Sequence, residues 1–347
     1  MAVIDDIIVT RRGHRLFDEE VWDFGARIQG RLMENISDSA LKNRLTQIEK
    51  NIQYLDEAPG RREELPPEHG WLSPWFWLRL RHWTLAELAA RSITRPPTVY
   101  IPLMSALRSE FRGTHGGGDK RQVRISRLPW LLDTLDRGRL RLSPATIYRT
   151  IEGDEARTDN EMMKAYQRPS HILTITDSRG QRIEPIGDVT FATSRVASDG
   201  ETEIPYWLMC FSTDLDPRLF AEFSSAEGDD AVIVIFDLIA FLQRALPHLQ
   251  RVAPLSEKNL HTVNYYDGYH PASRNLSPVT MKDIRFACQR EWRMILDPGG
   301  RELLAEGGAL SVDIGSIADI AAVYAPDGMR IAGSGPDSFF ASPPDNN

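Results

Sequence analysis

The stretch Phe286–Leu296, FACQREWRMIL, decides how this chain is interpreted. Apolar and polar residues alternate along most of it, which is typical of a β-strand with one face in the core. Because residues two apart share a face, we expect Gln289, Glu291 and Arg293 to lie together, with Trp292 in the core on the other face. An edge strand that exposes its polar face to water gives the same pattern. The residues upstream are needed to choose between the two.

The composition is that of a globular protein with a sizeable core. Of the 347 residues, 41% are hydrophobic and 26% are charged, and the net charge is -8. This acidic balance argues against a protein that coats nucleic acid without sequence preference. Two cysteines, Cys210 and Cys288, provide neither a disulfide framework nor a zinc site. With no secretory pattern at the N-terminus and no long apolar run, we expect a cytoplasmic protein that does not enter a membrane.

Residues 1–115 are predicted to form a mainly helical domain. Glu19–Arg31 and Ser39–Leu55 carry apolar residues at spacings of three and four, as amphipathic helices do. Trp71–Arg91 is rich in aromatic residues, which favours packing in a core or an interface over a nucleic-acid surface. The run Gly116–Gly118 is the clearest flexible segment, so we expect a domain boundary there.

Residues 119–330 alternate short strands with a few helices, which predicts an α+β fold. A helix is expected at Trp130–Asp136, ended by Gly138. The polar segment 146–168 is predicted to become helical toward its end, with Asp159 and Glu161 on a solvated face of ion pairs. Residues 331–347 are expected to form a loosely ordered tail. The clearest strands are Gln122–Ser126, Tyr206–Phe211, Ala231–Phe236 and Ala321–Tyr324.

Three separated pieces carry polar groups that strand packing does not require. Arg124 lies within VRIS, Ser212 and Thr213 end the segment CFST, and Gln289 and Glu291 lie in the stretch quoted above. Each piece alone has an ordinary explanation: a surface arginine, a helix cap and an edge strand. Their order along the chain is more informative than any one of them.

In this order the pieces resemble the ADP-ribosyltransferase superfamily, which has an arginine on its first strand, Ser-Thr ending a central strand and a glutamate on a late strand. The segments LRLSP, CFST and REWR are most similar to poorly characterised bacterial families of that superfamily, and more distantly to DarT-type toxins. The resemblance covers roughly residues 120–325. It implies a split β-sheet domain that follows the helical N-terminal domain.

The resemblance implies an NAD-dependent mono-ADP-ribosyltransferase, acting as a bacterial toxin or an anti-phage defence effector. NAD would be its substrate, a nucleic acid or a protein its acceptor, and a neutralising antitoxin a further partner. The implied catalytic residues are Glu291, Gln289 and Ser212, with Ser212 holding Glu291 and Gln289 orienting the acceptor. The implied NAD contacts are Arg124, Thr213, Ser212, Phe220, Phe223, Tyr148 and Arg141. Phe220 and Phe223 depart from the family, which commonly has a tryptophan and a tyrosine in that helix.

The chemistry of NAD cleavage needs residues of these types. A planar guanidinium grips a pyrophosphate through two parallel hydrogen bonds, which fits Arg124, with Arg139 or Arg141 as alternatives. Cleavage of the nicotinamide–ribose bond develops positive charge on the ribose, as in glycoside hydrolysis. A carboxylate facing that charge stabilises it, and Glu291 is the candidate. A glutamine at position 289 is a poor activator of a guanidinium acceptor, which favours other acceptors.

Other functions remain open at this stage. An NAD glycohydrolase would use the same site without an acceptor. A non-catalytic protein that binds nucleic acid or a partner would keep the fold alone. The segment Asp119–Arg149 favours an anionic ligand, because it holds eight basic residues against three aspartates. A nuclease has little support and no metal is expected, because no set of carboxylates and histidines has the spacing of metal ligands.

Overall fold

The computed structural model describes residues 10–11, 14–15, 30–55, 74–101, 107–111, 121–150, 159–223, 227–271, 273–299 and 308–341. The chain divides into two compact units, each made of three segments. The first unit comprises Met1–Ile101, Met163–Thr193 and Asn264–Cys288, and the second comprises Pro102–Met162, Ser194–Val263 and Gln289–Asn347. The units therefore alternate along the chain, whereas the sequence predicted one linear division at Gly116–Gly118, which lies outside the described residues.

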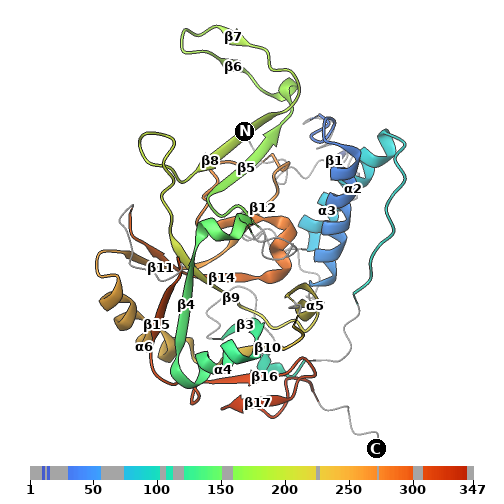
Figure 1. The fold of residues 1–347 in the computed structure, drawn as a ribbon. Coiled ribbons are helices and arrows are strands. Elements are labelled where there is room, and N and C mark those ends of the chain that lie inside the picture. The colour runs from blue at the N-terminus through green and yellow to red at the C-terminus, as the bar shows by residue number, and fades with distance from the viewer. Residues whose placement is uncertain are drawn as a thin grey trace, which may run out of the picture. The chain divides into compact units, whose positions relative to one another are not determined.

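The second unit is built on an antiparallel sheet (Figure 1). Its described part has nine strands, in the order β11-β14-β9-β3-β10-β16-β17, with β4 and β15 joined at the side. With the helices, this sheet gives the α+β class that the sequence predicted. The strands are β3 (Gln122–Arg127), β4 (Arg139–Pro144), β9 (Trp207–Ser212), β10 (Asp230–Ile235), β11 (Glu257–Thr262), β14 (Glu291–Asp297), β15 (Leu310–Asp313), β16 (Ala321–Tyr324) and β17 (Arg330–Gly333).

Both faces of this sheet are covered by apolar side chains. On one face, helices α4 (Leu128–Arg137) and α6 (Leu238–Val252) pack on residues such as Ile233 of β10. On the other face, Val232 and Val234 of β10 contact a second cluster. Successive side chains of β10 point to two buried faces, so its sequence is a continuous run of apolar residues.

Gly138 ends α4 in the left-handed conformation, with a φ of 64°, as the sequence predicted. A Cβ atom at this position would lie 2.1 Å from the carbonyl oxygen of Gly315, so no side chain fits. The glycine is therefore required by its conformation and by its surroundings. Two 3₁₀ helices, η3 (Ser109–Phe111) and η4 (Ala145–Thr150), and the short helix α5 (Leu219–Phe223) complete the described part of this unit.

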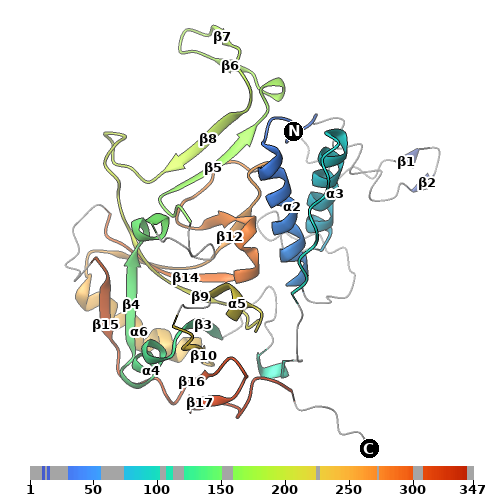
Figure 2. The same ribbon diagram turned by 45° about the vertical axis from the view of Figure 1, so that its right-hand side comes forward.

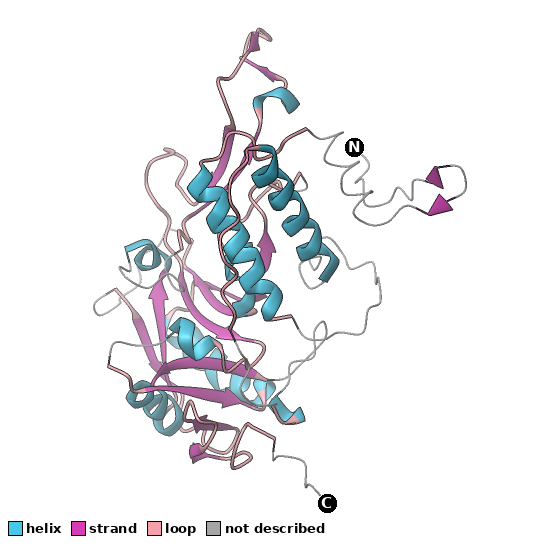
Figure 3. Cartoon of the chain, turned by 90° about the vertical axis from the view of Figure 1, so that its right-hand side faces the viewer, coloured by secondary structure: helices cyan, strands magenta, loops and turns pink. Residues whose placement is uncertain are grey.

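The described part of the first unit contains a helix pair and four small two-stranded ribbons. Helices α2 (Asp38–Gln53) and α3 (Pro74–Ala90) lie side by side (Figure 3). The hairpin of β6 and β7 extends from the far end of the β5–β8 ribbon (Figure 2). The remaining elements are β1 (Thr10–Arg11), β2 (His14–Arg15), β5 (Met163–Arg168), η5 (Ser170–Ile172), β6 (Ile175–Thr176), β7 (Arg182–Ile183), β8 (Val189–Ser194), β12 (Asn264–Tyr266), β13 (Met281–Asp283) and η6 (Ile284–Gln289).

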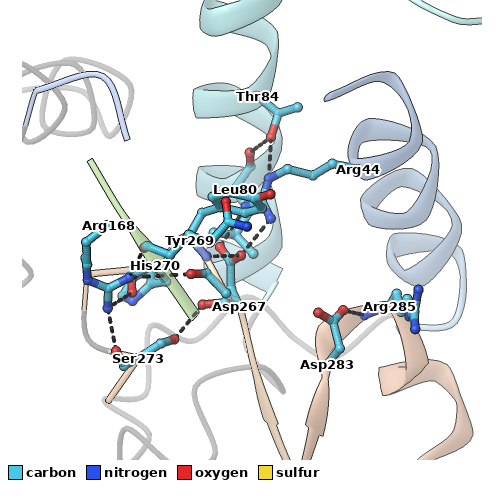
Figure 4. A network of polar contacts seen from close by, with 12 residues as sticks. Arg44, Leu80, Thr84, Arg168, Asp267, Tyr269, His270, Ser273, Asp283 and Arg285 are labelled. Atoms are coloured by element: carbon cyan, nitrogen blue, oxygen red, sulfur yellow. Dashed lines mark hydrogen bonds and ion pairs between the residues drawn. The ribbon is translucent and has the colours of Figure 1, made fainter. Parts of the chain in front are cut away.

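A buried polar network holds the segments of the first unit together (Figure 4). Arg44 of α2 donates to both carboxylate oxygens of Asp267 at 2.6 Å, and the Asp267 side chain is only 1% exposed. Arg168 of β5 donates to the carbonyl oxygens of His270 and Ser273 in the loop after Asp267. Bidentate charged contacts of this kind are strong and directional. They join α2, β5 and the loop after β12, which explains why sequence segments far apart form one unit.

The structure decides several expectations about individual elements. The helix predicted at Ser39–Leu55 is confirmed as α2, whereas Glu19–Arg31 lies largely outside the described residues. The helix predicted toward the end of segment 146–168 is wrong, because β5 occupies that position. The tail is also ordered further than expected, since β17 pairs with β16 and Phe339 is fully buried in an apolar cluster.

Candidate active site

The strand that carries Glu291 begins at Glu291 itself. The 3₁₀ helix η6 occupies Ile284–Gln289, so Gln289 does not share a strand face with Glu291, and this expectation was wrong. Asn51 of α2 supports η6: its side-chain amide donates to the Arg285 carbonyl at 3.1 Å and accepts from the Cys288 N–H at 2.7 Å. These contacts satisfy backbone groups that strand pairing would otherwise satisfy.

Arg290, between η6 and β14, has an unusual backbone conformation with a φ of 44°. Non-glycine residues with positive φ are uncommon and are concentrated at functional sites. The side chain of Arg290 forms an ion pair with Asp214, and both residues are buried. Its carbonyl oxygen accepts from the backbone N–H of Thr213 at 2.9 Å and from the Thr213 hydroxyl at 3.1 Å. Arg290 is therefore held through its side chain by Asp214 and through its backbone carbonyl by Thr213.

The two hydroxyls of the CFST segment are engaged with the backbone. Ser212 donates to the carbonyl oxygen of Asp214 at 2.7 Å and accepts from the Asp214 N–H at 3.2 Å. Thr213 binds Arg290, as described above. The resemblance implied that Ser212 holds Glu291 and that Thr213 contacts NAD. The described contacts instead show both hydroxyls organising the turn that fixes the start of β14.

Glu291 lies opposite Ser212 in the pairing of β14 with β9, and it is only 4% exposed. Its Oε1 atom accepts from Nε of Arg293 at 2.5 Å, and Nη2 of the same guanidinium donates to Oε1 of Glu161 at 2.7 Å. Burial alone would lower the pKa of Arg293, but the two carboxylates outweigh it and hold that pKa well above its ordinary value. Arg293 therefore joins a carboxylate of its own strand to one that lies before β5.

The environment predicted for Glu161 from the sequence was wrong. Glu161 was expected on a solvated helical face, but it is 2% exposed and its carboxylate faces Arg293. The Tyr206 hydroxyl donates to the Glu161 backbone carbonyl at 3.2 Å, which fixes the loop before β5. No local pattern could have revealed this role, because Arg293 lies 132 positions away in the chain.

Arg124 lies where the sheet divides. Strand β3 pairs with β9 only at Val123 and Ser212, while β4 pairs with the other end of β9. Between these pairings, Nη1 of Arg124 donates to the carbonyl oxygen of Cys210 at 2.7 Å. Among the described residues, Arg124 has no carboxylate partner, which is unusual for a half-buried arginine. The rest of its guanidinium can therefore receive an anion.

Tyr148 lies in the same neighbourhood, on the 3₁₀ helix η4. Burial raises the pKa of Tyr148 well above its ordinary value; Cys210 and Glu291 raise it further, and the positive charge of Arg124 opposes them. Within the ranges that the structure describes, no residue forms a hydrogen bond with the Tyr148 hydroxyl.

The remaining predicted NAD contacts are Phe220, Phe223 and Arg141, which lie on α5 and β4. Phe220 of α5 packs against the apolar cluster that contains Val123, and Phe223 is half-buried on the same helix. Arg141 is exposed on β4, opposite Ser311 of β15. Sequence patterns alone did not choose among the arginines; the contact of Arg124 with β9 now favours Arg124.

The basic segment Asp119–Arg149 is less positive than its composition indicates. Several of its arginines form ion pairs with acidic residues that lie inside the segment or far from it in the sequence. The pairs are Arg127 with Asp229, Arg137 and Arg139 with Asp313, and Arg149 with Glu203. These partners neutralise much of the local charge, which weakens the case for a broad nucleic-acid surface in this segment.

The described residues hold no group of three or more His, Cys, Asp or Glu side chains arranged to bind a metal ion. Over the same ranges, no helix is both long enough and apolar enough to cross a membrane. Comparison with known proteins adds no name to this site: no protein-family model matches the chain, and neither a curated protein nor a solved structure shows significant similarity to it.

Proposed function

We propose that this protein is an NAD-dependent mono-ADP-ribosyltransferase, with its site on the second unit around Glu291. One observation carries the proposal. Arg124, Ser212 and Glu291 come from three separate parts of the sequence and meet at β9, where Arg124 binds the Cys210 carbonyl and Glu291 pairs with Ser212; the charges of Arg124 and Glu291 also act on Tyr148. The sequence resemblance named the same residues from short motifs alone. The divided sheet at β3, β9 and β4 supports the split-sheet architecture that this resemblance implies.

The side chains present are suited to NAD. Arg124 is half-buried and lacks a carboxylate partner among the described residues, so its guanidinium can bind a pyrophosphate. Tyr148 offers an aromatic ring and a hydroxyl without a described hydrogen-bond partner. Ring stacking and one polar contact are what a nucleotide base or a nicotinamide requires.

Glu291 would carry the chemistry. Loss of nicotinamide from NAD develops positive charge on the ribose, as glycosidic bond cleavage does. A carboxylate held rigidly beside that charge stabilises it without reorganising during the reaction. Arg293 fixes the Glu291 side chain, and the Arg290 junction fixes its backbone. Gln289, at the end of η6, would act on the acceptor side.

The proposal extends to a biological setting. The enzyme would act in the cytoplasm, where NAD is abundant, as a toxin or an anti-phage defence effector. Cys210 and Cys288 do not form a disulfide, which suits a reducing compartment. The first unit would then bind the acceptor or a neutralising antitoxin. The neutralised basic segment favours recognition of a defined target over general binding to nucleic acid.

The test uses NAD labelled in its adenylate part. Purified protein is incubated with this NAD and with candidate protein, DNA and RNA acceptors, with Glu291→Gln as the matched variant. Transfer of label by the wild type, reduced in the variant, supports the proposal. Release of nicotinamide with free ADP-ribose and no labelled acceptor would identify an NAD glycohydrolase. Neither transfer nor nicotinamide release by the wild type would refute both.

A further inference from the structure

The guanidinium of Arg293 links two carboxylates inside the second unit. Its Nε atom donates to Glu291 at 2.5 Å and its Nη2 atom donates to Glu161 at 2.7 Å. The exposed fractions are 0% for Arg293, 2% for Glu161 and 4% for Glu291. Three charged groups that are almost entirely buried are costly to remove from water. Glu161 therefore adds a second buried carboxylate to the Arg293–Glu291 pair, at a further desolvation cost.

We infer that Glu161 and Arg293 are positioning residues for Glu291. The forked guanidinium can satisfy both carboxylates only in one orientation, because its donors are fixed in a plane. Because Nη2 is bound to Glu161, the guanidinium cannot rotate freely while Nε binds Glu291. The contact of Nε with Oε1 then gives the Glu291 carboxylate a defined orientation.

Glu161 is itself held firmly, which the inference requires. Tyr206, fully buried, donates to the Glu161 carbonyl at 3.2 Å. The next residue, Met162, accepts at its carbonyl from the Arg195 N–H at 3.0 Å. Tyr206 also accepts from the Ala145 N–H at 2.8 Å, at the start of the 3₁₀ helix that carries Tyr148. The same buried tyrosine thus anchors the loop of Glu161 and the helix of Tyr148.

The backbone of Glu291 is fixed independently. Its carbonyl oxygen accepts from the Val263 N–H at 2.9 Å, and the preceding Arg290 is held by Thr213 and Asp214. With the backbone fixed, the contact with Arg293 helps to set the direction of the carboxylate. Misplacement of a reacting group by about 1 Å can cost on the order of 10²-fold in rate.

The inference rests on the proposed function for its catalytic consequence, and its test separates the two. We would prepare Glu161→Gln, which removes one charge and keeps the shape. The matched control is Asp297→Asn, which breaks the ion pair with Arg195 at the other end of the same strand. Selective ¹³C labelling of glutamate carboxyls, with Glu291→Gln for assignment, gives the signal of Glu291 without any need for activity.

The expected result is a changed Glu291 carboxyl signal in Glu161→Gln and an unchanged one in Asp297→Asn. For nicotinamide release, Glu161→Gln should lower kcat by about 10²-fold at similar KM. In the Glu291→Gln background the same change should cost nothing further, because residues that act through one another are not additive. A residue with a purely structural role would lower the melting temperature equally in both backgrounds and leave the signal of Glu291 in place.

The inference is overturned if Glu161→Gln leaves the Glu291 signal at its wild-type position. If Glu161→Gln does not fold, Glu161→Asp, which keeps the charge and shortens the side chain, is measured in the same way. A wild type that releases no nicotinamide would refute the proposed function, while the carboxyl signal would still decide whether Glu161 positions Glu291.

Discussion

His270 in the first unit should make the stability of this protein depend on pH. Its Nε2 atom accepts from Nη2 of Arg79 at 3.1 Å, so the ring is neutral in the folded state. Burial, and then the charge of Arg79, lower the pKa of His270 to about 3; Asp267 opposes this, while Arg44 and Arg168 add to it. Protonation would remove the acceptor and place a charge beside three arginines.

The size of the effect follows from proton linkage. An unfolded histidine has a pKa of about 6.5, so at pH 5 the unfolded chain binds a proton that the folded chain does not. Since the folded pKa is depressed, the stabilisation is complete above pH 6.5 and is lost as the pH falls toward 3. Between pH 8 and pH 5 the loss is about 2 kcal/mol, from 1.5 pH units at about 1.36 kcal/mol each.

The assay is urea unfolding of the wild type and His270→Gln at pH 8, 7, 6 and 5. Glutamine keeps an acceptor for Arg79 but does not titrate. The free energy of unfolding of the wild type should fall by about 2 kcal/mol more than that of the variant over this range. The control His261→Gln changes an exposed histidine of β11 and should behave as the wild type does. If the free energy of unfolding of wild type and His270→Gln changed equally with pH, His270 would not be the source of the pH dependence.

Three further outcomes are expected. Asp267→Asn leaves a buried arginine without its carboxylate and should cost about 3–5 kcal/mol in urea unfolding; a loss under 1 kcal/mol would show that the pair does not hold the first unit together. Gly138→Ala should be more destabilising than Gly180→Ala by thermal unfolding, because both have positive φ but only Gly138 has a carbonyl oxygen within 2.1 Å of the added Cβ. Arg124→Lys should raise the KM for NAD, whereas Arg139→Lys, already paired with Asp313, should not; equal effects would remove Arg124 from the site.

Local sequence signals predicted the strands and caps of the second unit well. β10 and β16 are continuous apolar runs, and Gly138 follows the last apolar turn of α4. Such patterns depend on neighbours within a few positions, which a sequence displays directly. Arg124, Ser212 and Glu291 lie in segments that were recognised as strands, but their grouping into one site came from the resemblance and stays a prediction.

Long-range contacts could not be predicted in this way. Arg44 and Asp267 are 223 positions apart, and Glu161 and Arg293 are 132 positions apart. No local pattern therefore indicated that three segments form the first unit, or that the Glu161 carboxylate is buried. The start of β14 was misplaced because Arg290 adopts a positive φ, which alternation of residue types does not reveal. The hydroxyls of Ser212 and Thr213 also bind the backbone of Asp214 and Arg290, contacts that the sequence motif did not reveal.

The most direct test of the central claim is nicotinamide release from NAD by the wild type and by Glu291→Gln, measured side by side. Both proteins should be folded, because Glu161 remains as a partner for Arg293 in the variant. The wild type should release nicotinamide, and loss of the charged carboxylate should slow release by about 10²–10³-fold. Equal rates for the two proteins, or no release by the wild type, would contradict the assignment of Glu291 as the catalytic carboxylate.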